Sequence, residues 1–170
     1  RVVVNPYPSP ISGITNVCTG ETTTLVSAPA TVKWYSGNTF LATVDSMTGV
    51  VEGLFTGNPV ITYMLPTGCA VTATTTVLPS PPGSIGSSNV CLGASTTLTN
   101  SIPGGVWSST NTSVADMGSS AGVISGLAVG FANILYTIPN GCKAVTFMAV
   151  TDSPFVYNVT GGGGYCGGGT

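Results

Sequence analysis

The sequence repeats itself after 73 residues, and this repeat restricts the fold more than any other feature of the chain. When the chain is shifted by 73 positions, cysteines fall on cysteines and tryptophan falls on tryptophan, without a gap. The matched pairs include Cys18 with Cys91, Trp34 with Trp107, Tyr63 with Tyr136, Pro66 with Pro139 and Cys69 with Cys142. Since a fixed period of this kind marks tandem structural units, we predict two complete modules, residues 8–80 and 81–153.

The two ends of the chain fit the same period. Residues 1–5 occupy the position of residues 74–78, so residues 1–7 are predicted to be the last strand of a preceding module and a linker. Residues 154–170 are predicted to begin a third, different module, in which Cys166 would be the first cysteine. Residues 1–170 would then be part of a longer array of modules, and the partner of Cys166 is expected outside them. A free or intermolecular thiol is the alternative.

Short β-branched segments bounded by glycine, proline or asparagine indicate strands. In the first module they are residues 22–27, 31–35, 60–65 and 70–78. No segment shows a convincing helical period. About seven short strands in each repeat predict an all-β protein made of two tandem β-sandwich modules. A module of this size has a small core and is expected to need a covalent cross-link.

The cysteines of the two modules are predicted to supply that cross-link. Four cysteines allow three pairings, and the repeat favours Cys18–Cys69 and Cys91–Cys142, because each pair then stays within one module. Each second cysteine follows a Pro-Thr-Gly or Pro-Asn-Gly turn signal, so the bridge is expected to join a hairpin tip to an early strand. A zinc site is not supported, since the chain has no C-x-x-C pair and no histidine. Disulfides indicate an oxidising, extracellular setting.

Composition excludes several classes of function. Only 5% of the residues are charged and the net charge is −2, which offers no basic surface for nucleic acid or anionic lipid. No apolar run reaches the roughly 18 residues that a membrane span requires. Without histidine, neither a Ser-His nor a Cys-His nucleophile can be assembled, and the five acidic residues do not recur at the repeat spacing. We predict no enzymatic activity, no metal and no cofactor.

Four aromatic residues recur with the repeat, and we predict that they form the framework of the two cores. They are Trp34, Trp107, Tyr63 and Tyr136. A sugar-stacking platform is the alternative for the two tryptophans. The residue types that recur are cysteine, tryptophan, glycine, proline and apolar residues, and these types serve folding.

The repeated motifs resemble a known family. The first copy reads VCTGETTTL, Trp34, GVVEGLFTG and ITYMLPTGC, and the second reads VCLGASTTL, Trp107, GVISGLAVG and ILYTIPNGC. They are similar to bacterial immunoglobulin-like repeats of the invasin and intimin type, especially the cysteine-bearing version in large surface proteins of Bacteroidetes-type bacteria. The resemblance covers about residues 8–153 and implies an Ig-like β-sandwich in a secreted or cell-surface stalk, adhesin or filament. It implies no catalytic residue. Lys33 and Asn58-Pro59 depart from the usual pattern.

We therefore expect a structural module of an extracellular repeat protein that forms a cell-surface stalk, fibre or filament. Its expected partners are neighbouring copies or modules of the same protein. The alternative is an adhesin module that binds glycan or protein through its variable loops, residues 36–48 and 108–121, using aromatic residues such as Tyr35 or Phe40.

Covalent glycans are further candidate partners. A β-rich surface with few charges has little protection against association between sheet edges, and attached sugar would supply it. Asp45-Ser46-Met47 resembles the O-glycosylation acceptor of Bacteroidetes-type bacteria, and two asparagines fit the N-x-S/T pattern. The candidate glycosylation sites are Ser46, Asn111 and Asn158.

Overall fold

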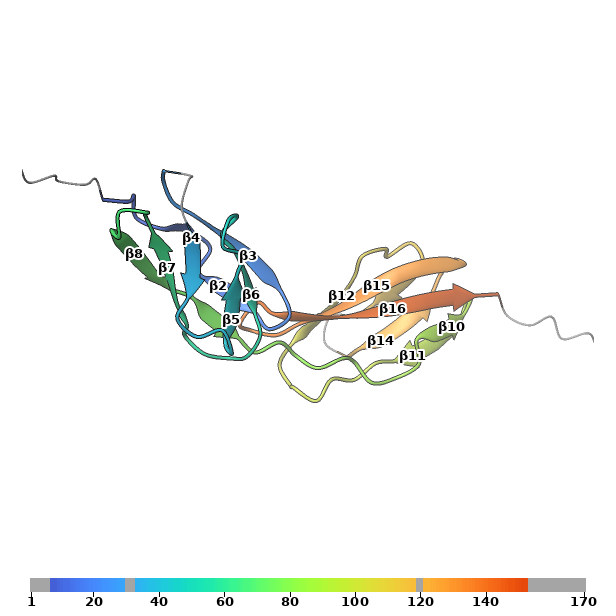
Figure 1. Cartoon of the computed structure of the whole chain (residues 1–170). Coiled ribbons are helices and arrows are strands. Elements are labelled where there is room, and N and C mark those ends of the chain that lie inside the picture. Colours follow the sequence, from blue (N-terminus) through green and yellow to red (C-terminus); the bar gives the residue numbers. More distant parts are fainter. Residues whose placement is uncertain (1–6, 30–32, 119–120, 153–170) are drawn as a thin grey trace, which may run out of the picture.

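The computed structural model describes residues 7–29, 33–118 and 121–152, and these residues form strands and turns with no helix. Figure 1 shows two sets of strands arranged end to end. We call strands β1–β9 the first module and strands β10–β16 the second module. The fold is an Ig-like β-sandwich, as predicted. The boundaries 8–80 and 81–153 stay a prediction, and residues 1–5, Asn158 and Cys166 lie outside the described residues.

The first module contains two main sheets, ordered β1-β3-β6-β5 and β4-β7-β8, with β2 paired to β9. Its strands are β1 (Ser12–Gly13), β2 (Asn16–Cys18), β3 (Thr22–Val26), β4 (Lys33–Ser36), β5 (Ala42–Val44), β6 (Val50–Gly53), β7 (Val60–Met64), β8 (Ala70–Thr74) and β9 (Thr76–Leu78).

The second module repeats this plan with sheets ordered β10-β16-β15-β12 and β11-β14-β13. Its strands are β10 (Asn89–Cys91), β11 (Ser95–Thr97), β12 (Val106–Ser109), β13 (Ala115–Met117), β14 (Val123–Gly126), β15 (Gly130–Thr137) and β16 (Lys143–Thr151). Strands β12, β13 and β14 lie 73 positions after β4, β5 and β6, so the sequence period is also a structural period.

One strand in each module runs parallel to its neighbour, whereas the other described pairs are antiparallel. β2 lies parallel to β9 with Cys18 beside Leu78, and β10 lies parallel to β16 with Cys91 beside Thr151. The first cysteine of each module therefore sits at the carboxyl end of that module's last strand.

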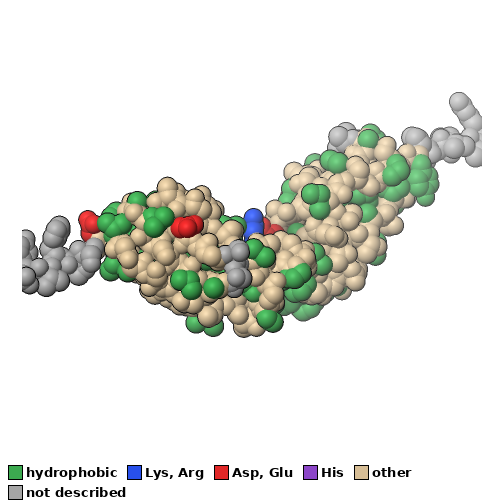
Figure 2. Space-filling view, turned by 180° about the vertical axis from the view of Figure 1, so that it is seen from behind, with side chains coloured by type: hydrophobic (Ala, Val, Ile, Leu, Met, Phe, Trp, Pro, Cys, Tyr) green, Lys and Arg blue, Asp and Glu red, His purple; other side chains and the backbone are tan. Residues whose placement is uncertain are grey.

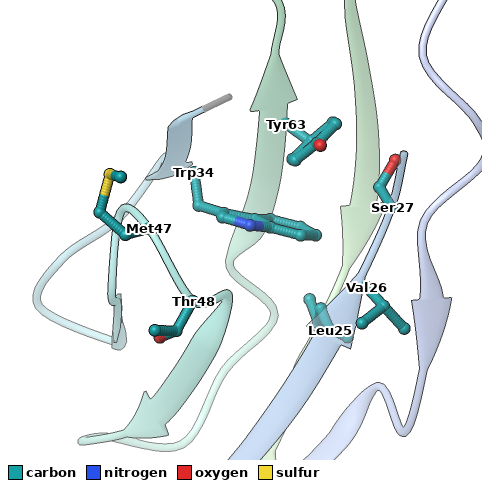
Figure 3. A pocket seen from close by; sticks show the side chains of 7 residues that line it. All are labelled: Leu25, Val26, Ser27, Trp34, Met47, Thr48 and Tyr63. Carbon is teal, nitrogen blue, oxygen red and sulfur yellow. The ribbon is translucent and has the colours of Figure 1, made fainter. Parts of the chain in front are cut away.

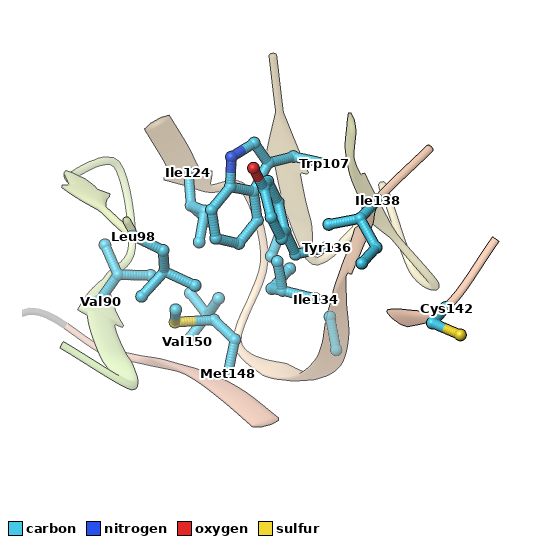
Figure 4. Packing of buried hydrophobic residues seen from close by; sticks show 12 residues of the cluster. Val90, Leu98, Trp107, Ile124, Ile134, Tyr136, Ile138, Cys142, Met148 and Val150 are labelled. Carbon is cyan, nitrogen blue, oxygen red and sulfur yellow. The ribbon is translucent and has the colours of Figure 1, made fainter. Parts of the chain in front are cut away.

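Each module has its own hydrophobic core. Alternation along the strands sends every second side chain inward, as in β15, where Ala132, Ile134 and Tyr136 are buried. Figure 4 shows the second core, in which Ile134 lies against the Trp107–Tyr136 pair. The first core is built around Trp34 and Tyr63 at the equivalent positions. Separate cores allow the modules to act as separate units joined by a junction.

The last strand of the first module is interrupted at Thr75, although residues 70–78 were predicted to form one strand. The N–H of Thr75 donates to the carbonyl of Pro59 at 2.9 Å, but proline has no N–H to return the second bond of the pair. The equivalent residues in the second module, Ala132 and Met148, pair within an unbroken ladder. Pro59 therefore explains the split into β8 and β9.

Replacing Thr75 with valine is expected to stabilise the first module by about 1 kcal/mol. The Thr75 side chain is fully buried and its hydroxyl has no hydrogen-bond partner. Removing the hydroxyl therefore removes a desolvation cost that no hydrogen bond offsets. Urea unfolding should show a higher midpoint at an unchanged slope. Thr74→Val is the control, because Thr74 is exposed on the same strand. If Thr75→Val lost stability and Thr74→Val did not, the conclusion that the Thr75 hydroxyl is buried without a hydrogen bond would be contradicted.

Candidate functional site

The most distinctive site of the molecule is the junction between the two modules, where a disulfide joins Cys18 to Cys142. The two Cα atoms are 5.7 Å apart and the S–S distance is 2.02 Å. Cys18 ends β2 in the first module, and Cys142 immediately precedes β16 in the second. Figure 1 shows the turn between β15 and β16 reaching the strands of the first module. The junction is therefore covalent.

This bridge corrects the predicted pairs Cys18–Cys69 and Cys91–Cys142. Cys18 lies beside Leu78 at the end of β9, whereas Cys69 immediately precedes β8. Cys69 and Leu78 are nine residues apart in extended chain. At about 3.3 Å per residue, Cys69 therefore lies about 30 Å from the position beside Leu78 that Cys18 occupies. A disulfide requires Cα atoms within about 7 Å, so the two cysteines of one module cannot meet.

The same geometry separates Cys91 from Cys142. Cys91 lies beside Thr151 at the end of β16, and Cys142 precedes the start of β16. Figure 4 shows Val90, the neighbour of Cys91, and Cys142 at opposite sides of the second core. Among the described cysteines, Cys69 and Cys91 are unpaired.

Hydrogen bonds and apolar contacts support the bridge. In the linker that follows β9, the Ser80 hydroxyl donates to the carbonyl of Thr19 at 2.8 Å, and the Ser80 N–H donates to the Thr19 hydroxyl at 3.0 Å. The Asn140 side chain, in the turn that carries Cys142, donates to the carbonyl of Pro79 at 2.9 Å. Cys18 and Leu78 also pack against the core of the second module. These contacts fix the second module against the end of the first.

The four aromatic residues lie where the core prediction put them. Their exposed fractions are 4% for Trp34, 2% for Tyr63, 6% for Trp107 and 4% for Tyr136. The ring centroids are 4.6 Å apart in the first module and 4.5 Å apart in the second. The Tyr136 hydroxyl donates to the carbonyl of Ile102 and accepts from the N–H of Gly105. Buried rings of this kind hold loops in place and present no face to a sugar.

A small pocket of about 130 Å³ lies beside Trp34. Figure 3 shows the Trp34 ring between the Tyr63 ring and the turn that carries Met47 and Thr48. Tyr63 is the only titratable residue in the lining; its hydroxyl donates to the carbonyl of Pro29, and burial raises its pKa. The lining residues are Leu25, Val26, Ser27, Trp34, Met47, Thr48 and Tyr63. This lining contains no carboxylate, histidine, lysine or cysteine, so it offers no general base to activate the hydroxyls of Ser27 and Thr48.

Ionisable side chains do not gather elsewhere in the part of the chain that the structure describes. No group of three or more His, Cys, Asp or Glu residues there could hold a metal ion, and no helix there is long and apolar enough to cross a membrane. Figure 2 shows few charged side chains on one face of the molecule, in keeping with a charged fraction of 5%. The chemistry of the surface is that of hydroxyls, amides and apolar groups.

Ser46 lies exposed at the tip of a tight turn between β5 and β6. The Asp45 carboxylate accepts hydrogen bonds from the N–H of Thr48 at 2.7 Å, the Thr48 hydroxyl at 2.8 Å and the N–H of Met47 at 3.0 Å. The bond from the Thr48 N–H contributes most to lowering the pKa of Asp45. Asn111 is half-buried, and its side-chain oxygen accepts from Ser113 at 2.6 Å.

Exposed aromatic pairs form a feature that the sequence analysis identified only in part. Phe40, in the loop at residues 36–48, stacks on Phe55 with centroids 4.4 Å apart. Phe131 and Phe147 stack on the outer face of β15 and β16, with centroids 5.1 Å apart. The sequence contained a signal that Phe131 is exposed, because Phe131 precedes the inward-pointing Ala132 on the same strand and therefore points outward.

The sequence matches no known protein family and no curated protein. Among solved structures, the chain is similar to domains 4 and 5 of the S-layer protein SbsC, with 14% identity and a TM-score of 0.38 over 86% of this chain and all of that fragment. It spans 24% of the longer SbsC(31–844) structure. It is also similar to a 282-residue fragment of intimin in complex with the intimin-binding domain of its receptor, with 13% identity and a TM-score of 0.47 over 86% of this chain and 64% of that one. In each case the likeness is one of fold.

Proposed function

We propose that this chain is a spacer segment in the shaft of an extracellular surface protein. The observation that carries the proposal is the bridge between modules, because a disulfide that joins Cys18 to Cys142, 124 positions apart, removes residues 19–141 from the covalent path between the two ends of the chain. Tension applied at the two ends passes through the sulfur atoms. A shaft built in this way keeps its length even when a module unfolds.

The disulfide also supports a location outside the cytoplasm, since such bonds persist in oxidising compartments. The side chains that recur in both modules lie in the cores, the turns and the junction. Recurrent residues of this kind suit a protein that holds a fixed distance between two points.

Single-molecule stretching tests this function directly. Pulled from its two ends, the oxidised chain should release no length from residues 19–141. After reduction, or in Cys18→Ser, it should release up to about 40 nm more, since 124 residues extend by about 3.3–3.6 Å each. Cys91→Ser is the matched control and should behave as the unsubstituted chain. Equal extension of the oxidised and reduced chains would overturn the proposal.

An adhesin module is the second candidate function, and the exposed pair of Phe40 and Phe55 at the variable loop 36–48 favours it. Phe40 is 65% exposed and stacks nearly parallel to Phe55, at 2° between the ring planes. Paired exposed rings offer an apolar face to a sugar or a protein. In a binding screen against glycans, Phe40→Ser should abolish any specific signal. Phe131→Asn is the control, because asparagine stands at the equivalent position 58 of the first module.

Glycosylation at Ser46 is a further proposal for native material. Ser46 is exposed in a turn held by Asp45, so an attached sugar would meet no neighbouring strand. The peptide that contains Ser46 is expected to be heavier in native material than its calculated mass, and Ser46→Ala should remove the difference. Material from a host without this modification is the control. Equal native and calculated masses would contradict the proposal.

A further inference from the structure

The two unpaired cysteines of the described chain lie at opposite ends of the molecule. Cys69 lies in the turn before β8, and Cys91 ends β10. Figure 1 shows β8 at one end of the molecule and β10 at the other. In the repeat, Cys69 corresponds to Cys142 and Cys91 corresponds to Cys18, which are the two partners of the central bridge. Each end of the molecule thus carries one half of the junction.

The end with Cys69 is built like the bonded half with Cys142. The carbonyl of Cys69 accepts the N–H of Leu65 at 2.8 Å, as the carbonyl of Cys142 accepts the N–H of Ile138 at 2.9 Å. The glycine that precedes each cysteine has nearly the same backbone angle, φ 87° in the first module and 90° in the second. The turn that presents the thiol is therefore already formed.

The end with Cys91 is likewise built like the bonded half with Cys18. The carbonyl of Cys91 accepts the N–H of Ala94 at 3.0 Å, and the carbonyl of Cys18 accepts the N–H of Glu21 at 3.0 Å. The residue after each cysteine donates to the end of the last strand, Leu92 to Thr151 at 2.8 Å and Thr19 to Leu78 at 2.9 Å. Both unpaired halves therefore have the backbone geometry of the bonded junction.

We propose that Cys91 of one copy of this chain forms a disulfide with Cys69 of a second copy, so that the junction between modules is repeated between chains. This inference rests on the proposed shaft function. The two thiols lose two electrons and two protons, and a small disulfide such as oxidised glutathione accepts them and becomes two thiols. Because the two halves differ, the contact is head-to-tail, and because they lie at opposite ends of the molecule (Figure 1), repeated contacts extend into an open filament wherever the rotation between copies does not close a ring.

The side chains around the unpaired halves differ from those of the central junction. Asn140 donates to the carbonyl of Pro79 across the central junction, and the Thr19 hydroxyl accepts the N–H of Ser80 in the linker. Thr67 and Leu92 stand at the equivalent positions of the two ends, so the amide donor and the hydroxyl acceptor are missing there, and association of two copies is expected to depend on the disulfide. Reduced chains are expected to be monomeric, and oxidised chains are expected to form a ladder of oligomers.

Two variants of the full chain test the pairing. Both carry Cys166→Ser, and one adds Cys69→Ser while the other adds Cys91→Ser, so each retains one half of the proposed bond. In a glutathione buffer, the equimolar mixture should give at least ten times more covalent dimer than either variant alone. Mass spectrometry of the dimer should identify a peptide in which Cys91 is linked to Cys69.

Equal dimer yields from the mixture and from the single variants would overturn the proposal, and so would monomers that keep both thiols. The outcome is independent of the central bridge, which is measured in the same digests as the link between Cys18 and Cys142. Loss of that link would count against the shaft function, whereas its presence without a Cys69–Cys91 link would count against the filament alone.

Discussion

Cys18→Ser is expected to lower the free energy of unfolding by about 3–5 kcal/mol, which corresponds to a fall in Tm of about 10 °C. In the chain-entropy treatment, a bridge over 124 residues restricts the unfolded chain strongly and therefore stabilises the folded one. Thermal unfolding under non-reducing conditions, followed by tryptophan fluorescence, measures the change. Each module contains one tryptophan, Trp34 or Trp107, so the fluorescence follows the unfolding of both modules.

Cys91→Ser is the matched control for this prediction. Cys91 occupies the same place in the second module but has no partner in the described chain, so its replacement should change the stability by less than about 1 kcal/mol. Bridges within each module would make the two variants equally destabilising. That result would contradict a bridge between modules.

Gly122→Ala is expected to destabilise the second module by about 3–5 kcal/mol, at the upper end for a single substitution. Gly122 has φ 63°, and a Cβ atom there would lie 2.2 Å from the carbonyl oxygen of Leu98. Gly122 also accepts the N–H of Leu98 at 2.9 Å, so β11 cannot move away without losing that bond. Gly49 makes the same close approach to Leu25 in the first module.

Substitutions at two other glycines distinguish the two causes of this loss, the left-handed backbone and the close contact of the added Cβ atom. Gly93 has φ 78° but open space around it, so Gly93→Ala should cost only the backbone strain, about 1–2 kcal/mol. Gly118 has open space and no left-handed backbone, so Gly118→Ala should change stability by less than about 0.5 kcal/mol. Urea unfolding of the three variants measures the series. Similar losses for Gly122→Ala and Gly93→Ala would show that the close contact has no effect.

Much of the fold could be predicted because the same pattern of strands and turns is visible in both copies of the repeat. Strand positions followed from short β-branched segments, and the equivalent strands β4 and β12 begin 73 residues apart, at Lys33 and Val106. The paired rings of Trp34 and Tyr63 followed from their recurrence and apolar character. The break at Thr75 was not predicted, because it depends on the missing N–H of Pro59 across the sheet.

The disulfide pairing could not be predicted for a similar reason. The prediction placed Cys18 within reach of the hairpin tip that carries Cys69. β2 pairs instead with β9, residues 76–78 at the far end of the last strand, and this position depends on the whole sandwich and not on any local pattern. Cys18 therefore lies nine residues along the strand from Cys69, and its partner comes from the next module.

Disulfide mapping of non-reduced material tests the bridge between modules most directly. Trypsin is unsuitable, because cleavage at Lys33 and Lys143 leaves Cys69, Cys91 and Cys142 in one peptide. Cleavage after aromatic residues not followed by proline places Cys18 in 1–34, Cys69 and Cys91 in 64–107, and Cys142 in 137–147. A linked pair of 1–34 with 137–147 is predicted. A linked pair of 1–34 with 64–107 would contradict a covalent junction between the modules.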